Sequence, residues 1–188
     1  MSEQQLTAPP AAPAPAGEPH GRWSLLVPYA VQAVAIVAIF AAVGAVAGVV
    51  WEWVWTPPVG VVVHHQWLQD EVGLRGDFSA TGTYVLVAVV AGLLTGVVVS
   101  LLLDRSELVT LVAVVAGALL AGWVMHRVGS HLGPADPRHL AASAKDETQL
   151  PGPLVVSGKS ALRAFPAGAL LGLTVVFLGF SRLRRTGG

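Results

Sequence analysis

The chain has no cysteine and few charged residues, and both absences limit what it can be. Without cysteine it forms no disulfide, thiolate metal site or cysteine nucleophile. Charged residues make up 12% of the 188 residues, against the roughly 25% of an average soluble domain. The formal net charge is zero, which gives nucleic acid no electrostatic attraction, so nucleic acid is not an expected partner. Hydrophobic residues reach 54%, which is typical of a membrane protein.

Four long stretches contain no charge at all. They lie between Arg22 and Glu52, Asp77 and Asp104, Glu107 and Arg127, and Arg163 and Arg182. About 20 apolar residues cross the ~30 Å of hydrocarbon in a bilayer, and a helix satisfies its own backbone hydrogen bonds there. The sequence therefore predicts an all-α membrane protein, a bundle of four transmembrane helices. The expected spans are about residues 25–51, 83–103, 108–126 and 162–180 of a membrane domain that covers residues 23–181.

The two ends of the chain differ from this domain. Residues 1–22 are rich in proline and alanine, which offer little apolar surface to bury, so we expect a disordered tail. Residues 182–188 form a short basic tail. The neighbouring Arg182, Arg184 and Arg185, together with Arg105 in the short second loop, place both termini in the cytoplasm by the positive-inside rule. Arginine far outnumbers lysine, and alanine, valine, glycine and proline are abundant, which indicates the inner membrane of a GC-rich bacterium.

The loops expected to face outward run from about Glu52 to Gly82 and from about Arg127 to Ala161. Val59–His65 and Pro153–Ser157 contain short β-branched runs beside glycine or proline. Two readings stay open: the runs pair as a small extracytoplasmic β-ribbon, or they cross as irregular chain. By contrast, the loop between the second and third spans is so short that these two spans should form an antiparallel helical hairpin.

Small residues recur four positions apart within every expected span, which is the spacing that lets helix backbones approach closely in lipid. The expected packing residues are Gly44 and Gly48, Gly92 and Gly96, Gly117 and Ala121, and Gly168 and Gly172. Packing within the chain is favoured over a dedicated dimer face. At the far end of the first span, Trp51, Glu52, Trp53 and Trp55 are expected at the headgroup layer, where tryptophan rings concentrate.

Histidines are the one chemically suggestive group. His64, His65, His126 and His131 all fall in or beside the outward loops, and imidazole is a common ligand of zinc. His126 and His131 are five residues apart rather than the four that align two side chains on one helix face, and no HExxH motif occurs. These residues are therefore weak metal candidates, and solvated interfacial histidines are the favoured interpretation. No metal or other cofactor is expected.

Catalytic signatures are missing as well. No serine has the GxSxG context, and the glycine-rich segments lie inside apolar spans rather than between a strand and a helix. Uncharged spans also offer no intramembrane carboxylate pair for a hydrolase or a proton relay. We therefore expect a protein that is not an enzyme.

Two segments carry a resemblance to a known family. Gly76–Gly82, expected as the end of an outward loop, and the third span running through Gly117 to Arg127–Gly129 and Leu132–Pro134 resemble a family of actinobacterial four-span membrane proteins known only as a domain of unknown function. The resemblance covers about Trp23 to Phe180. It implies membrane class and bacterial source, and it transfers no reaction and no functional residue.

Three hypotheses for the function follow. The favoured one is a non-enzymatic accessory or scaffolding subunit of a bacterial cell-envelope complex, embedded in the lipid bilayer and bound to a membrane-protein partner or to copies of itself. The alternatives are a component of a small oligomeric transporter or channel, and an extracytoplasmic metal or pH sensor that uses the histidines.

Overall fold

The computed structural model describes residues 22–102, 106–158 and 160–186, and its main elements are four long helices. These are α1 (Arg22–Val54), α2 (Glu71–Leu102), α3 (Glu107–Leu132) and α5 (Ala164–Thr186). All four are long and apolar enough to cross a membrane, so the predicted four-helix bundle is confirmed. The disordered tail expected for residues 1–22 lies, except for Arg22, outside the described residues.

The second helix begins at Glu71, well before the expected start near Thr83. Asp70 initiates it, because its side-chain oxygen Oδ1 accepts a hydrogen bond of 2.8 Å from the backbone N–H of Gly73. The expectation that Gly76–Gly82 ends a loop is therefore wrong, since this segment is helical. Asp70 followed by Glu71 is a recognised helix-start signal. The expected start near Thr83 missed it because the charges and glycines that follow are untypical of a membrane span.

The other three helices also extend beyond the predicted spans, the first by three residues at each end. The third continues past His126 to Leu132 and stops only where Gly133 and Pro134 break the pattern. The last helix follows a single 3₁₀ turn, η1 (Ala161–Arg163), and continues to Thr186, so the basic segment at residues 182–186 belongs to the helix.

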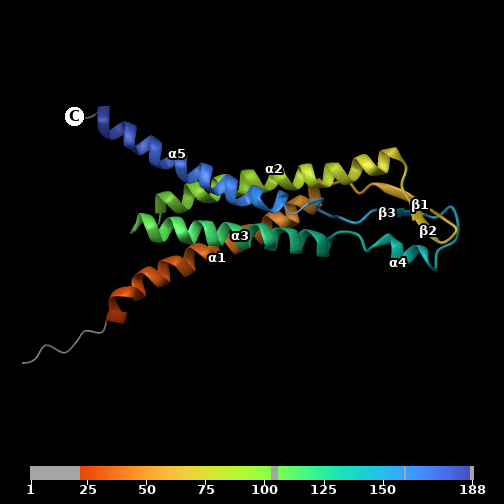
Figure 1. Ribbon diagram of the computed structural model, residues 1–188, viewed down its shortest axis with the longest axis horizontal. Helices are drawn as coiled ribbons and strands as arrows, with labels where there is room; N and C mark the ends of the chain where they lie inside the picture. Colours follow the sequence, from red (N-terminus) through yellow and green to blue (C-terminus); the bar gives the residue numbers. More distant parts are fainter. Residues whose placement is uncertain (1–21, 103–105, 159, 187–188) are drawn as a thin grey trace, which may run out of the picture.

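The helices pack as two parallel pairs rather than in chain order. Gly44 of α1 faces Ala121 of α3, and Gly48 faces Met125, so the residue numbers rise together and the two helices run parallel. Likewise Gly168 and Gly172 of α5 face Val89 and Leu93 of α2. Figure 1 confirms that α2 and α3 run in opposite directions, but each packs mainly on another helix, α2 on α5 and α3 on α1.

A small three-stranded sheet lies at one end of the bundle, beside the start of α2 (Figure 1). Its strands are β1 (Val59–Val63), β2 (Gln66–Leu68) and β3 (Gln149–Pro151), and β1 is central and antiparallel to both neighbours. Of the two alternatives for the outward loops, the paired β-ribbon is correct. The position expected for its second strand, Pro153–Ser157, is wrong. The strand precedes Gly152 instead of following it, and Gly152 donates its backbone N–H to the carbonyl of Pro58 over 2.7 Å.

Trp67 holds the sheet together. Its indole Nε1 donates to the carbonyl of Leu150 on β3 over 3.2 Å, so the ring reaches across the central strand. A Cβ added at Gly60 would lie 2.5 Å from Nε1 of Trp67, which explains why the central strand has no side chain at this position. The short helix α4 (Pro137–Ala141) packs on β2 and β3. We call β1, β2, α4 and β3 the loop module, since both long loops contribute to it.

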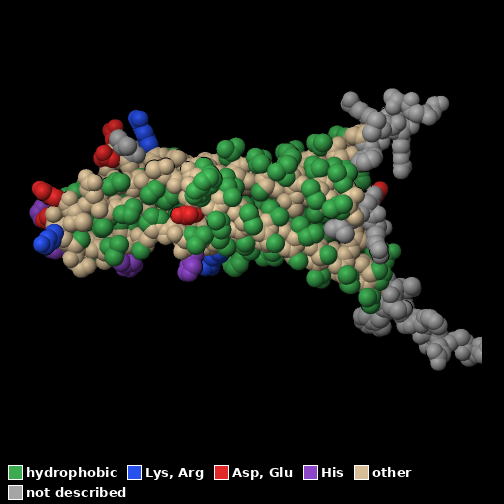
Figure 2. Space-filling model, turned by 180° about the vertical axis from the view of Figure 1, so that it is seen from behind, with side chains coloured by type: hydrophobic (Ala, Val, Ile, Leu, Met, Phe, Trp, Pro, Cys, Tyr) green, Lys and Arg blue, Asp and Glu red, His purple; other side chains and the backbone are tan. Residues whose placement is uncertain are grey.

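The two ends of the molecule differ in polarity. On the face shown in Figure 2, hydrophobic side chains cover the helices, and most acidic, basic and histidine side chains lie toward the loop module. The first described residue, Arg22, and the last, Thr186, lie at the opposite end of the bundle (Figure 1). We call these the sheet end and the terminal end. This separation is the one expected of a multi-pass membrane protein.

Candidate functional site

Gly44 and Gly48 lie where α1 crosses α3. A Cβ added at Gly44 would be 2.5 Å from the carbonyl oxygen of Ala121, and one added at Gly48 would be 2.7 Å from the carbonyl oxygen of Met125. Contacts this short between backbones are the reason small residues are enriched at helix interfaces in lipid. Ala121 is completely buried, so the first parallel pair is packed backbone to backbone.

The second pair is packed in the same way. Added Cβ atoms at Gly92 and Gly96 of α2 would overlap the carbonyl oxygens of Phe165 and Ala169 of α5. In the reverse direction, Gly168 and Gly172 of α5 face the carbonyls of Val89 and Leu93. The small residues of the two helices therefore interlock along one line of contact.

Gly117 differs from the other glycines because it contacts a side chain of the neighbouring helix instead of its backbone. A Cβ there would be 3.1 Å from Cβ of Phe40, whose ring is completely buried. The sequence-predicted packing residues thus all face other helices of the same chain. Since the chain itself covers these surfaces, they are not free to bind a partner helix.

Two hydrogen bonds join the helix pairs near the sheet end. Trp51 of α1 donates from Nε1 to the carbonyl of Ala80 on α2 over 2.9 Å. Tyr84 of α2 donates from its hydroxyl to the carbonyl of Gly122 on α3 over 2.8 Å. The rings of Trp51 and Tyr84 also meet edge to face, with centroids 5.0 Å apart.

The expected headgroup belt of tryptophans is only partly correct. Trp51 is completely buried and Trp55 nearly so, and only Trp53 is well exposed, at 82%. Alternate positions of a helix face different sides, and the side that carries Trp51 and Trp55 points into the bundle. The sequence did not reveal this because tryptophan suits both a membrane interface and a core.

Polar groups at membrane depth are engaged within the bundle. Gln32 of α1 donates from Nε2 to the hydroxyl of Thr110 on α3 over 3.0 Å, and both side chains are buried. Thr95, Ser100 and Thr174 each donate to the backbone carbonyl four residues earlier in the same helix. Such bonds are ordinary in transmembrane helices and indicate packing rather than a transport path.

The structure distributes the four candidate histidines over different elements. His64 and His65 form the two-residue turn between β1 and β2, His126 lies within α3, and His131 lies near its end. The Oγ of Ser130 lies 3.3 Å from Nδ1 of His126, and the ring of Trp51 lies 6.4 Å from the His126 ring. Across residues 22–102, 106–158 and 160–186, no three His, Asp or Glu side chains gather as a metal site requires.

The β1–β2 turn has unusual backbone geometry. His64 and His65 have φ angles of 51° and 59°, in the left-handed region that is common for glycine, uncommon for other residues, and adopted more often by asparagine, aspartate and histidine than by the rest. Two left-handed residues in a two-residue hairpin loop are typical of a type I′ turn, for which Asn-Gly is the preferred sequence. The two histidines therefore occupy an uncommon backbone conformation at the tip of the loop module, where glycine would fit with less steric cost.

One face of the sheet lacks any covering element among the described residues. Val59, Val61 and Val63 on β1 are 52%, 36% and 38% exposed, and Leu68, the cross-strand partner of Val61, is 51% exposed. The opposite face is buried, with Val62 completely inaccessible. Strand alternation thus puts these apolar side chains on one face of the loop module, beside the exposed Gln66 and Gln149 that pair with Val63 and Val61, and we call it the valine face.

Sequence reasoning missed the valine face although its signal was present. The run from Val59 to His65 left a paired strand and irregular chain open, and the register that decides which valines point outward comes from pairing with β2 and β3. Comparison with known proteins adds no family or relative: no protein-family model, no curated protein and no solved structure matches this chain.

Proposed function

We propose that this protein is a non-enzymatic accessory or scaffolding subunit of a complex in the bacterial cell membrane, with its loop module outside the cytoplasm. The observation that carries the proposal is the valine face. A contiguous group of exposed apolar side chains, held on a sheet away from the membrane helices, is characteristic of a surface that binds another protein.

The proposed partner is an extracytoplasmic protein segment with a matching apolar surface. The sheet lies beside the first turn of α2 at Glu71, before the apolar span that begins at Phe78, so we propose an extracytoplasmic segment rather than a membrane helix as the partner (Figure 1). The small-residue faces, which would otherwise be the natural contact for a partner helix, are used within the chain. Binding through the loop module therefore leaves the bundle with the role of anchor and support.

The experiment is site-specific photo-crosslinking followed by purification. A photoreactive amino acid at Val61, in the centre of the valine face, should crosslink one protein at near-stoichiometric yield in native membranes. The matched control is the same amino acid at Leu140 of α4, which is 45% exposed on the same module but lies outside the valine face. Mass spectrometry of the crosslinked band identifies the partner.

A second variant tests whether the contact is apolar. Replacing Val61 and Leu68 by glutamate places two charges on neighbouring strands of the exposed face and should abolish co-purification of that partner while the protein still inserts and folds. Equal crosslinking from Val61 and Leu140, or a partner that survives both glutamates, would count against the proposal. A protein that crosslinks only to copies of itself would favour the oligomeric transporter instead.

A further inference from the structure

Arg127 of α3 sits where the bundle passes from its apolar part to its polar end, and an aromatic ring holds its guanidinium. The guanidinium carbon lies 5.2 Å from the centroid of the Trp123 ring, one helical turn earlier. A cation over the face of tryptophan at this distance is a stabilising contact. Within the described parts of the chain, no carboxylate forms an ion pair with Arg127. The charge is therefore oriented by its neighbour but not neutralised.

The same face of α3 continues from Trp123 into the apolar part of the bundle. Arg127, Trp123, Leu120, Ala116 and Val112 recur every three or four residues, so they form one ridge along the helix. Trp123, Leu120 and Val112 are 51%, 38% and 62% exposed. Its side chains are exposed toward the surrounding lipid, and its lower part also borders α1.

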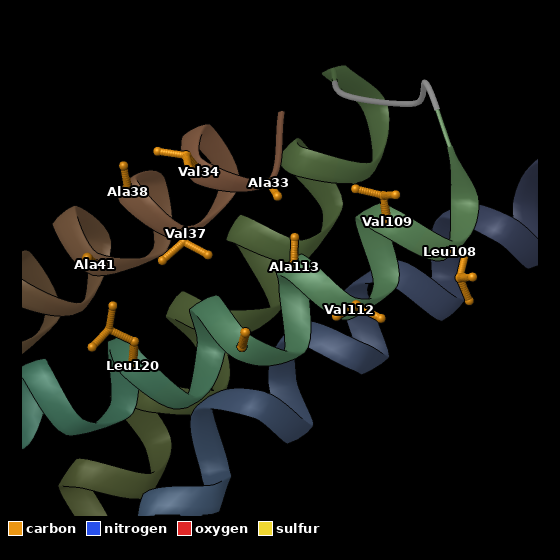
Figure 3. A pocket seen from close by; sticks show the side chains of 11 residues that line it. Ala33, Val34, Val37, Ala38, Ala41, Leu108, Val109, Val112, Ala113 and Leu120 are labelled. Carbon is orange, nitrogen blue, oxygen red and sulfur yellow. The ribbon is translucent and has the colours of Figure 1, made fainter. Parts of the chain in front are cut away.

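Beside the ridge lies an apolar groove between α1 and α3, with a volume of about 660 Å³ (Figure 3). Its lining is entirely alanine, valine and leucine, including Val37 and Ala41 from α1 and Ala116 and Leu120 from α3. Val112, Ala116 and Leu120 belong to both the groove and the ridge, and Leu120, the lining residue nearest to Trp123, lies about one helical turn before it in the sequence. A flexible hydrocarbon chain can enter it from that side.

From these contacts we infer an anionic phospholipid site, in which the lipid phosphate binds Arg127 and one acyl chain follows the ridge into the α1–α3 groove. Along α3 the groove begins at Leu120, a rise of about 10 Å from Arg127, passes Ala116 at about 16 Å and continues to Leu108. One leaflet fills half of the ~30 Å hydrocarbon core, so an acyl chain of a lipid held at Arg127 occupies the part of the groove from Leu120 to Ala116. Arginine supplies the donors that phosphate oxygens accept, and tryptophan suits the headgroup layer.

A lipid fits this surface better than a second protein helix does. A helix laid along the ridge would bury the Arg127 guanidinium, which is costly unless the partner brings a carboxylate to the same depth. A phospholipid carries its negative phosphate at the headgroup layer, where Arg127 lies, and its acyl chains below it, where the groove lies. The charge complementarity and the groove thus point to the same occupant.

Native mass spectrometry of the full-length protein in detergent, titrated with phosphatidylglycerol or phosphatidylcholine, tests the site. The wild type should bind one phosphatidylglycerol more tightly than the others and prefer it to phosphatidylcholine. Arg127→Gln should weaken that binding about fivefold, the amount expected for one arginine near a membrane surface, and remove the preference. Arg127→Lys should retain the preference, because it keeps the charge.

Three controls separate the parts of the proposal. Arg138→Gln removes an exposed arginine from α4 and should leave the binding of both lipids unchanged. Ala41→Leu with Ala116→Leu fills the groove and should weaken long-chain lipids while sparing a six-carbon-chain phosphatidylglycerol. Inorganic phosphate at millimolar concentration should displace no lipid, because a free anion lacks the acyl chain.

Each contrary result overturns a definite part of the inference. Equal loss of lipid in the Arg127 and Arg138 variants would mean that binding follows net charge alone. If long-chain lipids bind unchanged after the groove is filled, the acyl chain does not occupy the groove. Displacement by inorganic phosphate would assign Arg127 to a soluble anion, and a protein bound there instead of lipid would make the ridge an interface.

Discussion

The hydroxyl of Tyr84 on α2 donates a hydrogen bond of 2.8 Å to the backbone carbonyl of Gly122 on α3, which joins the two parallel helix pairs inside an apolar bundle. Tyr84 is completely buried, and its ring packs against Trp51, which in turn donates to the carbonyl of Ala80. Water is scarce in such surroundings, so these two bonds define how one pair sits on the other.

Tyr84→Phe should lower the free energy of unfolding by about 1 kcal/mol, because a hydrogen bond between membrane helices contributes about that much. The change keeps the ring and its contact with Trp51, so packing is preserved. Thermal unfolding in detergent measures the effect. Tyr29→Phe on α1 is the control, since Tyr29 is 43% exposed and should tolerate the change. Equal effects from both substitutions would show that the bond contributes nothing.

Two glycines of α2 should respond oppositely to alanine. At Gly96 an added Cβ would overlap the carbonyl of Ala169 on α5, so Gly96→Ala should destabilise the protein by roughly 1 to 3 kcal/mol through overpacking. At Gly82 no atom lies within 4 Å of the added Cβ, so Gly82→Ala should be neutral or stabilise by up to about 1 kcal/mol. Thermal unfolding of both variants, measured side by side, checks the difference. A stable Gly96→Ala protein would refute the packing of α2 on α5.

Comparing Trp51 with Trp55 measures how much a buried indole hydrogen bond contributes to the free energy of unfolding. The Nε1 of Trp51 donates to Ala80, whereas the Nε1 of Trp55 finds no acceptor among the described residues. Trp51→Phe should therefore cost about 1 kcal/mol more than Trp55→Phe, although both remove similar ring area. Chemical unfolding of the two variants gives the comparison. The reverse order would mean that the Trp55 indole has a partner of its own.

The turn between β1 and β2 should be improved by the residues that type I′ turns prefer. His64→Asn with His65→Gly relieves two left-handed side-chain positions and should stabilise the loop module by about 1 kcal/mol. Hydrogen exchange of the β1 and β3 amides should become slower. His139→Asn on α4, where no positive φ occurs, is the control and should change nothing. Faster exchange in the turn variant would show that the histidines stabilise the turn by contacts of their side chains.

The proposed orientation has its own test in a phosphatase reporter that is active only outside the cytoplasm. Fused after Gly188 it should be inactive, and inserted at Ala142, next to α4, it should be active. The basis is the group of arginines near the C-terminus, which favours the cytoplasmic side. The opposite pair of results would show that the orientation in the membrane is reversed, with the valine face in the cytoplasm. The fold itself would be unaffected.

The sequence alone determined that four helices form and roughly where they lie, because a long uncharged run in lipid has no other way to satisfy its backbone. It also marked the β-branched run after Pro57 and Pro58 as a candidate strand, with irregular chain as the open alternative, and showed the close spacing of small residues in every span. These are local properties, because they depend only on the composition of one segment and on the spacing of its residues.

The tertiary structure decided everything that depends on which segments meet. Every span carries a small-residue pair, so the sequence could not choose between partners, and only packing matched α1 with α3 and α2 with α5. The outward direction of Val61, the burial of Trp51 and the alignment of Arg127 with the groove follow from that choice. Shape complementarity between helices far apart in the chain selects the partners, and a pattern that all four helices share cannot encode that selection.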